Sequence, residues 1–204
     1  SNARDHRMDP DVPLLVPEIN PDDLALVETQ AGPGFIVANG NCSSIILELP
    51  LAALHRAFGV ESCDVVTMQG LSGAGHPGVP ALVSVDNVVP YIGGEEEKVE
   101  QEPRKTLGPG ADFPIRATCT RVPVREGHLE AIHLRLARPV SLEEAKAALA
   151  GFRGRGLATA ASIWNTGAIG AAVAFERADL AVVLSLANLA TLHLLARFSH
   201  PHGL

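Results

Sequence analysis

The chain has 204 residues, 47% of them hydrophobic, which is enough to build the core of one large domain or two small ones. Its formal net charge is −7 with both signs interspersed, and this argues against nucleic acid or an anionic membrane as a partner, because both select basic surfaces. Three widely spaced cysteines, with neither a Cys-x-x-Cys pair nor a secretory leader, fit a protein of the reducing cytoplasm.

An extended arm is predicted at the start of the chain. Ser1-Asn2-Ala3 has the sequence of a remnant left by tag removal, so residues 1–3 are set aside. Residues 10–34 are rich in proline and polar side chains, which predicts an extended segment with one short helical turn near Pro21 to Val27. We therefore expect an arm over residues 4–34 that leads into one domain over residues 35–204.

A strand, a helix and a second strand are expected next. Residues 35–38, "FIVA", are β-prone, and apolar side chains then recur on one helical face from about Cys42 to Phe58. Pro50 is expected to interrupt this helix and kink it near Ile46, because proline lacks the N–H that a helix interior uses. The run "SCDVVTMQ", residues 62–69, has a strand pattern.

A glycine-rich loop follows this strand. Its "GAGHPG", Gly73 to Gly78, matches the G-x-G-x-x-G pattern of dinucleotide-binding loops. Such a loop must open a helix that receives the phosphates, whereas here Pro77 and Pro80 follow at once. We therefore interpret the loop as a wall that lets backbone approach a ligand closely, with the Gln69 amide at its strand end.

The remaining elements predict the fold class. A polar helix and two strands are expected at residues 93–102, 113–124 and 128–137. Ser141 and Glu144 form a capping box that opens a helix to about Phe152. A strand is expected at residues 167–177, and the uncharged residues 180–196 fit a buried strand and helix better than a membrane span. Long strands without regular βαβ alternation predict an α+β fold, a mixed sheet with helices on one face.

Cys42 stands between a turn and a helix. Asn39-Gly40 has turn chemistry, which places Cys42 in the first turn of the predicted helix. Unpaired N–H groups and the positive end of the helix dipole favour an anion there, so the thiol is shifted toward the nucleophilic thiolate. The alternative is a small hydrophobic residue in the core, since free cysteines are often buried.

Five segments together resemble the archaeal and fungal branch of aspartate-semialdehyde dehydrogenase: "HRMDPDVPLLVPEINP", "GFIVANGNCSS", "TMQGLSGAGHPGVP", "DNVVPYIGGEEEKVE" and "RVPVREGHLE". The resemblance runs from about His6 to Phe152 and covers only the family's catalytic and dimerisation domain. It implies the α+β fold of the C-terminal domain of glyceraldehyde-3-phosphate and aspartate-semialdehyde dehydrogenases. The family's nucleotide-binding domain, which carries its true glycine fingerprint, has no counterpart in the sequence. After Phe152 the sequence departs from the family pattern.

The resemblance also implies a role for each matching residue. In the family pattern Cys42 is the nucleophile, His128 the acid and base that manages its proton, and Gln69 the amide that positions the acyl group. The implied substrate-binding residues are Arg121 for a carboxylate, Glu95 and Lys98 for the substrate amine and phosphate, and Asn41 for the developing oxyanion. Four of these residues have an alternative without a functional role: His128 as a polar strand-end residue, Arg121 as a surface ion pair, and Glu95 with Lys98 as a solvated charge run.

The implied reaction is the NADP-dependent reductive dephosphorylation of aspartyl phosphate to aspartate semialdehyde through a cysteine thioester, in amino-acid biosynthesis. The implied partners are this small substrate, phosphate and a second copy of the chain in a homodimer. We expect the chain alone to bind no NADP and to transfer no hydride, and no metal site is predicted. Two alternatives stay open: a malonyl-CoA reductase of the same branch, and a dimerisation module without catalysis.

Overall fold

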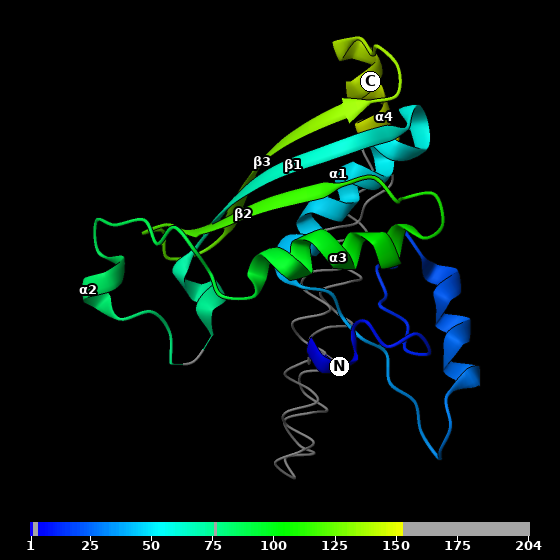
Figure 1. The fold of residues 1–204 in the computed structure, drawn as a ribbon, viewed down its shortest axis with the longest axis horizontal. Coiled ribbons are helices and arrows are strands. Elements are labelled where there is room, and N and C mark those ends of the chain that lie inside the picture. Colours follow the sequence, from blue (N-terminus) through cyan, green and yellow to red (C-terminus); the bar gives the residue numbers. More distant parts are fainter. Residues whose placement is uncertain (2–3, 76, 153–204) are drawn as a thin grey trace, which may run out of the picture. The chain divides into compact units, whose positions relative to one another are not determined.

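A three-stranded sheet forms the centre of the fold. The computed structural model describes residues 1, 4–75 and 77–152, and the described helices and strands lie in one compact unit, Ala3–Arg153. The strands, in the order β2-β1-β3, are β1 Val60–Gln69, β2 Ile115–Arg121 and β3 His128–Leu136 (Figure 1). β1 pairs in parallel with β2 and antiparallel with β3. The predicted mixed sheet is confirmed.

Two helices cover one face of this sheet. They are α1, Cys42–Phe58, and α3, Glu95–Leu107, and Figure 1 shows both on the same side of the strands. Their buried side chains meet those of the strands in one core: Leu47, Leu51, Val60, Cys63, Val65, Val99, Ala111, Phe113, Ile115 and Cys119. On the opposite face Val66 and Leu129 are exposed. Helices on one face of a mixed sheet are the predicted arrangement.

The predicted helix boundaries are largely confirmed. α1 begins at Cys42 and continues on both sides of Pro50, so the proline removes one backbone hydrogen bond without ending the helix. The short helix α4, Leu142–Gly151, begins after Ser141, and Ser141 and Glu144 form the predicted capping box. The glycine loop contains a 3₁₀ turn, Leu71–Ala74, and is followed by α2, Ala81–Ser84, which has four residues.

The predicted strand at residues 35–38 is wrong. Only Ala38 pairs there, in a single parallel bridge to Leu14 of the arm. The Gln30 side chain accepts from the Ile36 N–H at 2.7 Å and donates to the Ile36 carbonyl at 2.8 Å. One glutamine therefore satisfies the backbone groups that a neighbouring strand would have used.

The arm contains two 3₁₀ segments, Arg4–His6 and Pro21–Thr29, and the second confirms the predicted turn. Between them Leu14 and Val16 are buried, so this part of the arm packs against the domain. The sequences expected to form a strand at residues 167–177 and a buried strand and helix at residues 180–196 lie outside the described residues. Within residues 1, 4–75 and 77–152, every helix is too short or too polar to cross a bilayer.

Candidate active site

The N-terminus of α1 presents Cys42. Asn41 is the N-cap, and its side-chain oxygen accepts hydrogen bonds from the N–H groups of Ser43 and Ser44 at 3.0 and 3.2 Å. The cap fixes Cys42 as the first helical residue, as predicted, and Cys42 is exposed. Its thiol therefore lies at the positive end of the helix dipole and is open to a reactant.

Three predicted site residues form one row across the end of the sheet. The strand register pairs Gln69 of β1 with Arg121 of β2 on one side and with His128 of β3 on the other. Side chains of directly paired residues project from the same face of a sheet. Gln69 and Arg121 are buried on the face that the helices cover. The sheet therefore brings together residues from three separate stretches of sequence.

His128 contacts the cysteine directly, with 3.4 Å between its Nε2 and the Cys42 Sγ. Its Nδ1 lies 2.8 Å from the Gly127 carbonyl and 3.2 Å from the Gly70 nitrogen. The Gly70 N–H also donates to the Gly127 carbonyl at 2.8 Å, the shorter contact. We therefore assign the Nδ1 proton to the bond with Gly127, which leaves Nε2 able to accept the thiol proton.

The pKa of Cys42 is lowered and that of His128 is raised, and both shifts favour transfer of the thiol proton to the imidazole. Desolvation of the sulfur raises the pKa of Cys42, and the Glu95 charge adds to this, but the hydrogen bond and charge of His128 with the Ser43 N–H leave it below its ordinary value. The hydrogen bond to Cys42 raises the pKa of His128 most, against the opposing effects of desolvation and Arg121. A thiolate beside an imidazolium is favoured.

The other two thiols have the opposite environment. Cys63 and Cys119 are both buried in the core. Burial raises the pKa of Cys63 to about 12 and that of Cys119 to about 11, with nearby carboxylates adding to both effects. Of the three cysteines, Cys42 alone combines exposure with a lowered pKa.

Glu95 links the predicted substrate-binding residues. Its Oε1 accepts from the Asn41 side chain at 2.7 Å and from that of Gln69 at 3.4 Å, and its Oε2 accepts from Lys98 Nζ at 2.7 Å. Burial raises the pKa of Glu95, but the hydrogen bonds from Lys98 and Asn41 outweigh this effect. The net pKa lies below its ordinary value, so the carboxylate stays ionised. Because Glu95 is buried and bonded to Asn41 and Gln69, it is not part of a solvated charge run.

Arg121 is a buried cation at the same end of the sheet. Its side chain donates to the Gly70 carbonyl at 2.7 Å, and the residue is 6% exposed. Among the residues that the structure describes, no carboxylate forms an ion pair with Arg121. The surface ion pair considered from the sequence is therefore wrong. A desolvated guanidinium without a counter-ion favours an anionic ligand.

The glycine loop closes over these side chains. A Cβ atom at Gly73 would lie 2.7 Å from His128 Cε1 and 3.0 Å from an Arg121 side-chain nitrogen, so only glycine fits without displacing them. This close approach agrees with the interpretation of the loop as a wall. The loop does not fit the pyrophosphate of a dinucleotide, because α2, the next helix, has only four residues.

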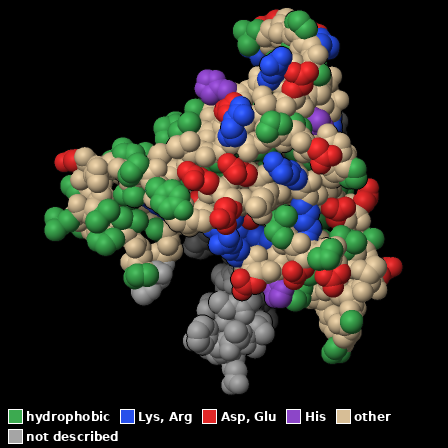
Figure 2. All heavy atoms as spheres, in the orientation of Figure 1, with side chains coloured by type: hydrophobic (Ala, Val, Ile, Leu, Met, Phe, Trp, Pro, Cys, Tyr) green, Lys and Arg blue, Asp and Glu red, His purple; other side chains and the backbone are tan. Residues whose placement is uncertain are grey.

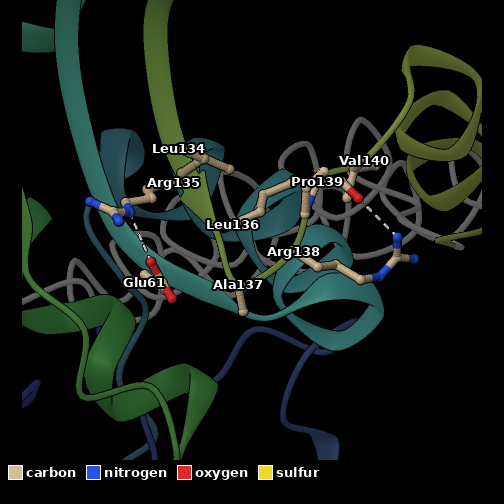
Figure 3. A pocket seen from close by; sticks show the side chains of 8 residues that line it. All are labelled: Glu61, Leu134, Arg135, Leu136, Ala137, Arg138, Pro139 and Val140. Carbon is tan, nitrogen blue, oxygen red and sulfur yellow. Dashed lines mark hydrogen bonds and ion pairs between the residues drawn. The ribbon is translucent and has the colours of Figure 1, made fainter.

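A pocket lies at the other end of the sheet from these residues (Figure 3). Its lining runs from Leu134 to Val140 and includes Glu61 of β1. Its charged groups are already paired, Arg135 with Glu61 at 2.8 Å and Arg138 with Glu144 at 3.2 Å. Because the sequence-predicted residues gather at the opposite end of β1, this pocket is not the candidate active site.

Two buried glutamates and one half-buried glutamate were missed in the sequence. Glu102 is buried beside Asn41, and Glu48 is buried within α1. Burial, together with the charge of Glu102, raises the pKa of Glu48 well above its ordinary value. Burial also raises the pKa of Glu130, two residues beyond His128, to about 7. Of the three, only Glu102 could have been identified from the sequence, because it lies seven residues after Glu95 and so on the same face of α3.

Comparisons with known proteins identify a family to which the chain is similar. The family described as "Semialdehyde dehydrogenase, dimerisation domain" matches residues 51–158. The aspartate-semialdehyde dehydrogenase of Archaeoglobus fulgidus is 50% identical over 159 residues, 72% of the chain and 46% of that protein. The Saccharomyces cerevisiae enzyme is 40% identical over 174 residues, 73% and 48% of the two chains. The chain therefore spans about half the length of the curated relatives it matches.

Solved structures show the same fold. The aspartate-semialdehyde dehydrogenase of Candida albicans, solved with NADP, matches with a TM-score of 0.65 and 39% identity over 72% of this chain and 47% of that one. The Vibrio cholerae enzyme II, solved with the ligand abbreviated ASA, matches with a TM-score of 0.66 and 30% identity over 75% and 52%.

Proposed function

The chain belongs to the semialdehyde dehydrogenase dimerisation-domain family, and from that premise we propose that it carries the acyl-transfer chemistry of an aspartate-semialdehyde dehydrogenase. The single observation that supports this most is the 3.4 Å contact between the Cys42 sulfur and His128 Nε2, beside the buried cation Arg121, which can bind an anionic group. A reactive thiolate, a proton acceptor and a carboxylate-binding cation are the groups that acyl transfer from an acidic acyl phosphate needs.

In the proposed step, the Cys42 thiolate attacks the carbonyl carbon of aspartyl phosphate. The bond from that carbon to the phosphate oxygen breaks, phosphate leaves with the electron pair, and a thioester remains on the sulfur. The thiol proton, held on His128 Nε2, is then available to the departing phosphate. The Cys42 N–H and the second side-chain proton of Asn41 are proposed to stabilise the oxyanion.

The substrate is proposed to lie between Arg121 and Glu95. The planar guanidinium can hold the substrate carboxylate with two hydrogen bonds, while Glu95 is suited to the ammonium group and Lys98 to the phosphate. Gln69, bonded to Glu95, is proposed to orient the acyl group. The glycine loop does not fit the pyrophosphate of a dinucleotide, and we propose that this chain transfers no hydride by itself.

Acyl capture tests this proposal. Mixed with aspartyl phosphate at pH 7, the chain is expected to release up to one phosphate per chain and to keep an acyl group on Cys42, because only this thiol is exposed with a lowered pKa. Phosphate release and peptide mass spectrometry measure the two products. Acylation spread equally over Cys42, Cys63 and Cys119, or no acylation, would favour a dimerisation module without catalysis. Faster acylation by malonyl-CoA would favour the malonyl-CoA reductase alternative.

A symmetric homodimer is proposed as the assembly. Hydrophobic side chains gather over α2 and its flanking loops in Figure 2, and Leu82 there is 97% exposed and Val85 63%. Val66 and Leu129 add exposed apolar area on the sheet face opposite α1 and α3, and two-fold pairing is the commonest way to bury such area. Sedimentation at micromolar concentration is expected to give one dimeric species. A monomer would contradict the proposal, and a broad size distribution would indicate aggregation instead.

A further inference from the structure

Two glutamates of α3, seven residues apart, hold the residue that precedes the nucleophile. Glu95 accepts from the Asn41 side chain at 2.7 Å, and Glu102 accepts from the Asn41 backbone N–H at 2.6 Å. Asn41 in turn caps α1 through its side-chain oxygen. Asn41 is therefore fixed through its backbone and its side chain at the point where α1 begins.

Glu102 forms an ion pair with the arm. The residue is 2% exposed, and its Oε1 accepts from an Arg7 side-chain nitrogen at 2.8 Å while its Oε2 binds Asn41. Arg7 itself is held in place, because Lys105 Nζ donates to the Arg7 carbonyl at 2.8 Å. The same ammonium group donates to two more arm carbonyls, those of Asp9 and Val12, at 2.6 and 2.8 Å.

Two other polar side chains lie near Glu102, Glu48 of α1 and Thr106 of α3. Glu48 of α1 is fully buried, and burial together with the charge of Glu102 raises its pKa well above the ordinary value. Thr106 of α3 donates to backbone carbonyls of its own helix, including that of Glu102. Glu102 and Arg7 form a buried ion pair, and breaking such a pair by removing one partner is strongly destabilising.

We propose that Glu102, charge-paired with Arg7, is a positioning residue for Cys42. By fixing the Asn41 backbone, the pair sets where α1 begins and so places the Cys42 sulfur within 3.4 Å of His128 Nε2. It connects the arm to the nucleophile without touching the reacting atoms. This inference rests on the proposed function, since it assumes that Cys42 is the nucleophile. Displacements of about 1 Å at such a contact can cost roughly a hundredfold in rate.

The test is the pH profile of Cys42 alkylation in the full chain, resolved by peptide mass spectrometry. In Glu102→Gln one carboxylate oxygen becomes an NH₂ donor that opposes either Arg7 or the Asn41 N–H. The inflection is expected to move to higher pH, and the rate at pH 6.5 to fall about tenfold, as the thiolate fraction drops. The matched control is Glu97→Gln, on the same helix and paired with Arg4 at 2.8 Å, but exposed. Its profile is expected to stay within about twofold of the parent.

A purely structural role predicts a different result. In that case folded Glu102→Gln, checked by circular dichroism, has a lower melting temperature but the parent's alkylation profile, and the positioning role is overturned. If this variant does not fold, Arg7→Met decides: a smaller slowing in the same direction supports the proposal, and the parent's profile overturns it. If neither variant folds, the pair serves the whole fold and the specific role is wrong.

The parent profile separates this inference from the proposed function. If Cys42 in the parent reacts no faster than Cys63 or Cys119, the nucleophile assignment fails before any variant is compared. If Cys42 reacts fast in both the parent and Glu102→Gln, only the positioning role fails.

Discussion

The Cys42→Ser variant is expected to lose acyl capture from aspartyl phosphate by about 10⁴-fold or more while keeping its fold. A serine hydroxyl has a far higher pKa than a thiol, so His128 cannot convert it to an anion near neutral pH. The side chain is exposed and nearly isosteric, and the free energy of unfolding is expected to change by no more than about 0.5 kcal/mol. Intact-protein mass spectrometry and thermal melting measure the two effects.

Cys119→Ala is the control for the loss of a thiol as such. This core residue is fully buried, so its truncation is expected to cost stability but to leave acyl capture on Cys42. A serine variant labelled as well as the parent by a substrate-mimicking acylating reagent would place the nucleophile elsewhere in the chain.

Local sequence signals were sufficient to locate Cys42 at the start of a helix. The Asn39-Gly40 turn and the apolar period after it act within a few residues, and α1 begins where they indicate. The structure adds the Asn41 cap, which was not predicted from the sequence. The capping box at Ser141 has the same local character. The roles of His128, Arg121 and Gln69 came instead from the family resemblance, because their single row depends on the register of three strands.

Side-chain contacts and packing that the local pattern does not encode explain the predictions that failed or were missed. Residues 35–38 have strand propensity, but the Gln30 side chain takes the backbone groups of Ile36. Arg7 and Glu102 lie 95 residues apart, and nothing near either residue in sequence indicates their pairing. Glu48 looks like an ordinary solvent-facing residue of an amphipathic helix, yet the packing of α1 and α3 buries it. These features therefore depend on specific side-chain contacts and on packing, and not on propensity or periodicity.

The His128→Asn variant is expected to slow acyl capture at pH 7 by about 10² to 10⁴-fold, the usual contribution of a positioned acid or base. In the parent, the hydrogen bond and charge of His128 outweigh the desolvation that raises the pKa of Cys42. Without His128 the desolvation and the Glu95 charge remain, so the pKa of the thiol is expected to rise above its ordinary value.

The pH dependence identifies this cause. The rate of the parent is expected to reach its plateau once the pH exceeds the lowered pKa of Cys42, whereas the rate of the variant should continue to rise into the alkaline range and approach the parent there. The matched control is His133→Asn, on the same strand but exposed, and it is expected to keep the parent's rate and profile. A His128→Asn profile that is lower at every pH by one constant factor would mean that His128 does not set the protonation of the thiol. Its contact with Cys42 would then contribute only to the shape of the site.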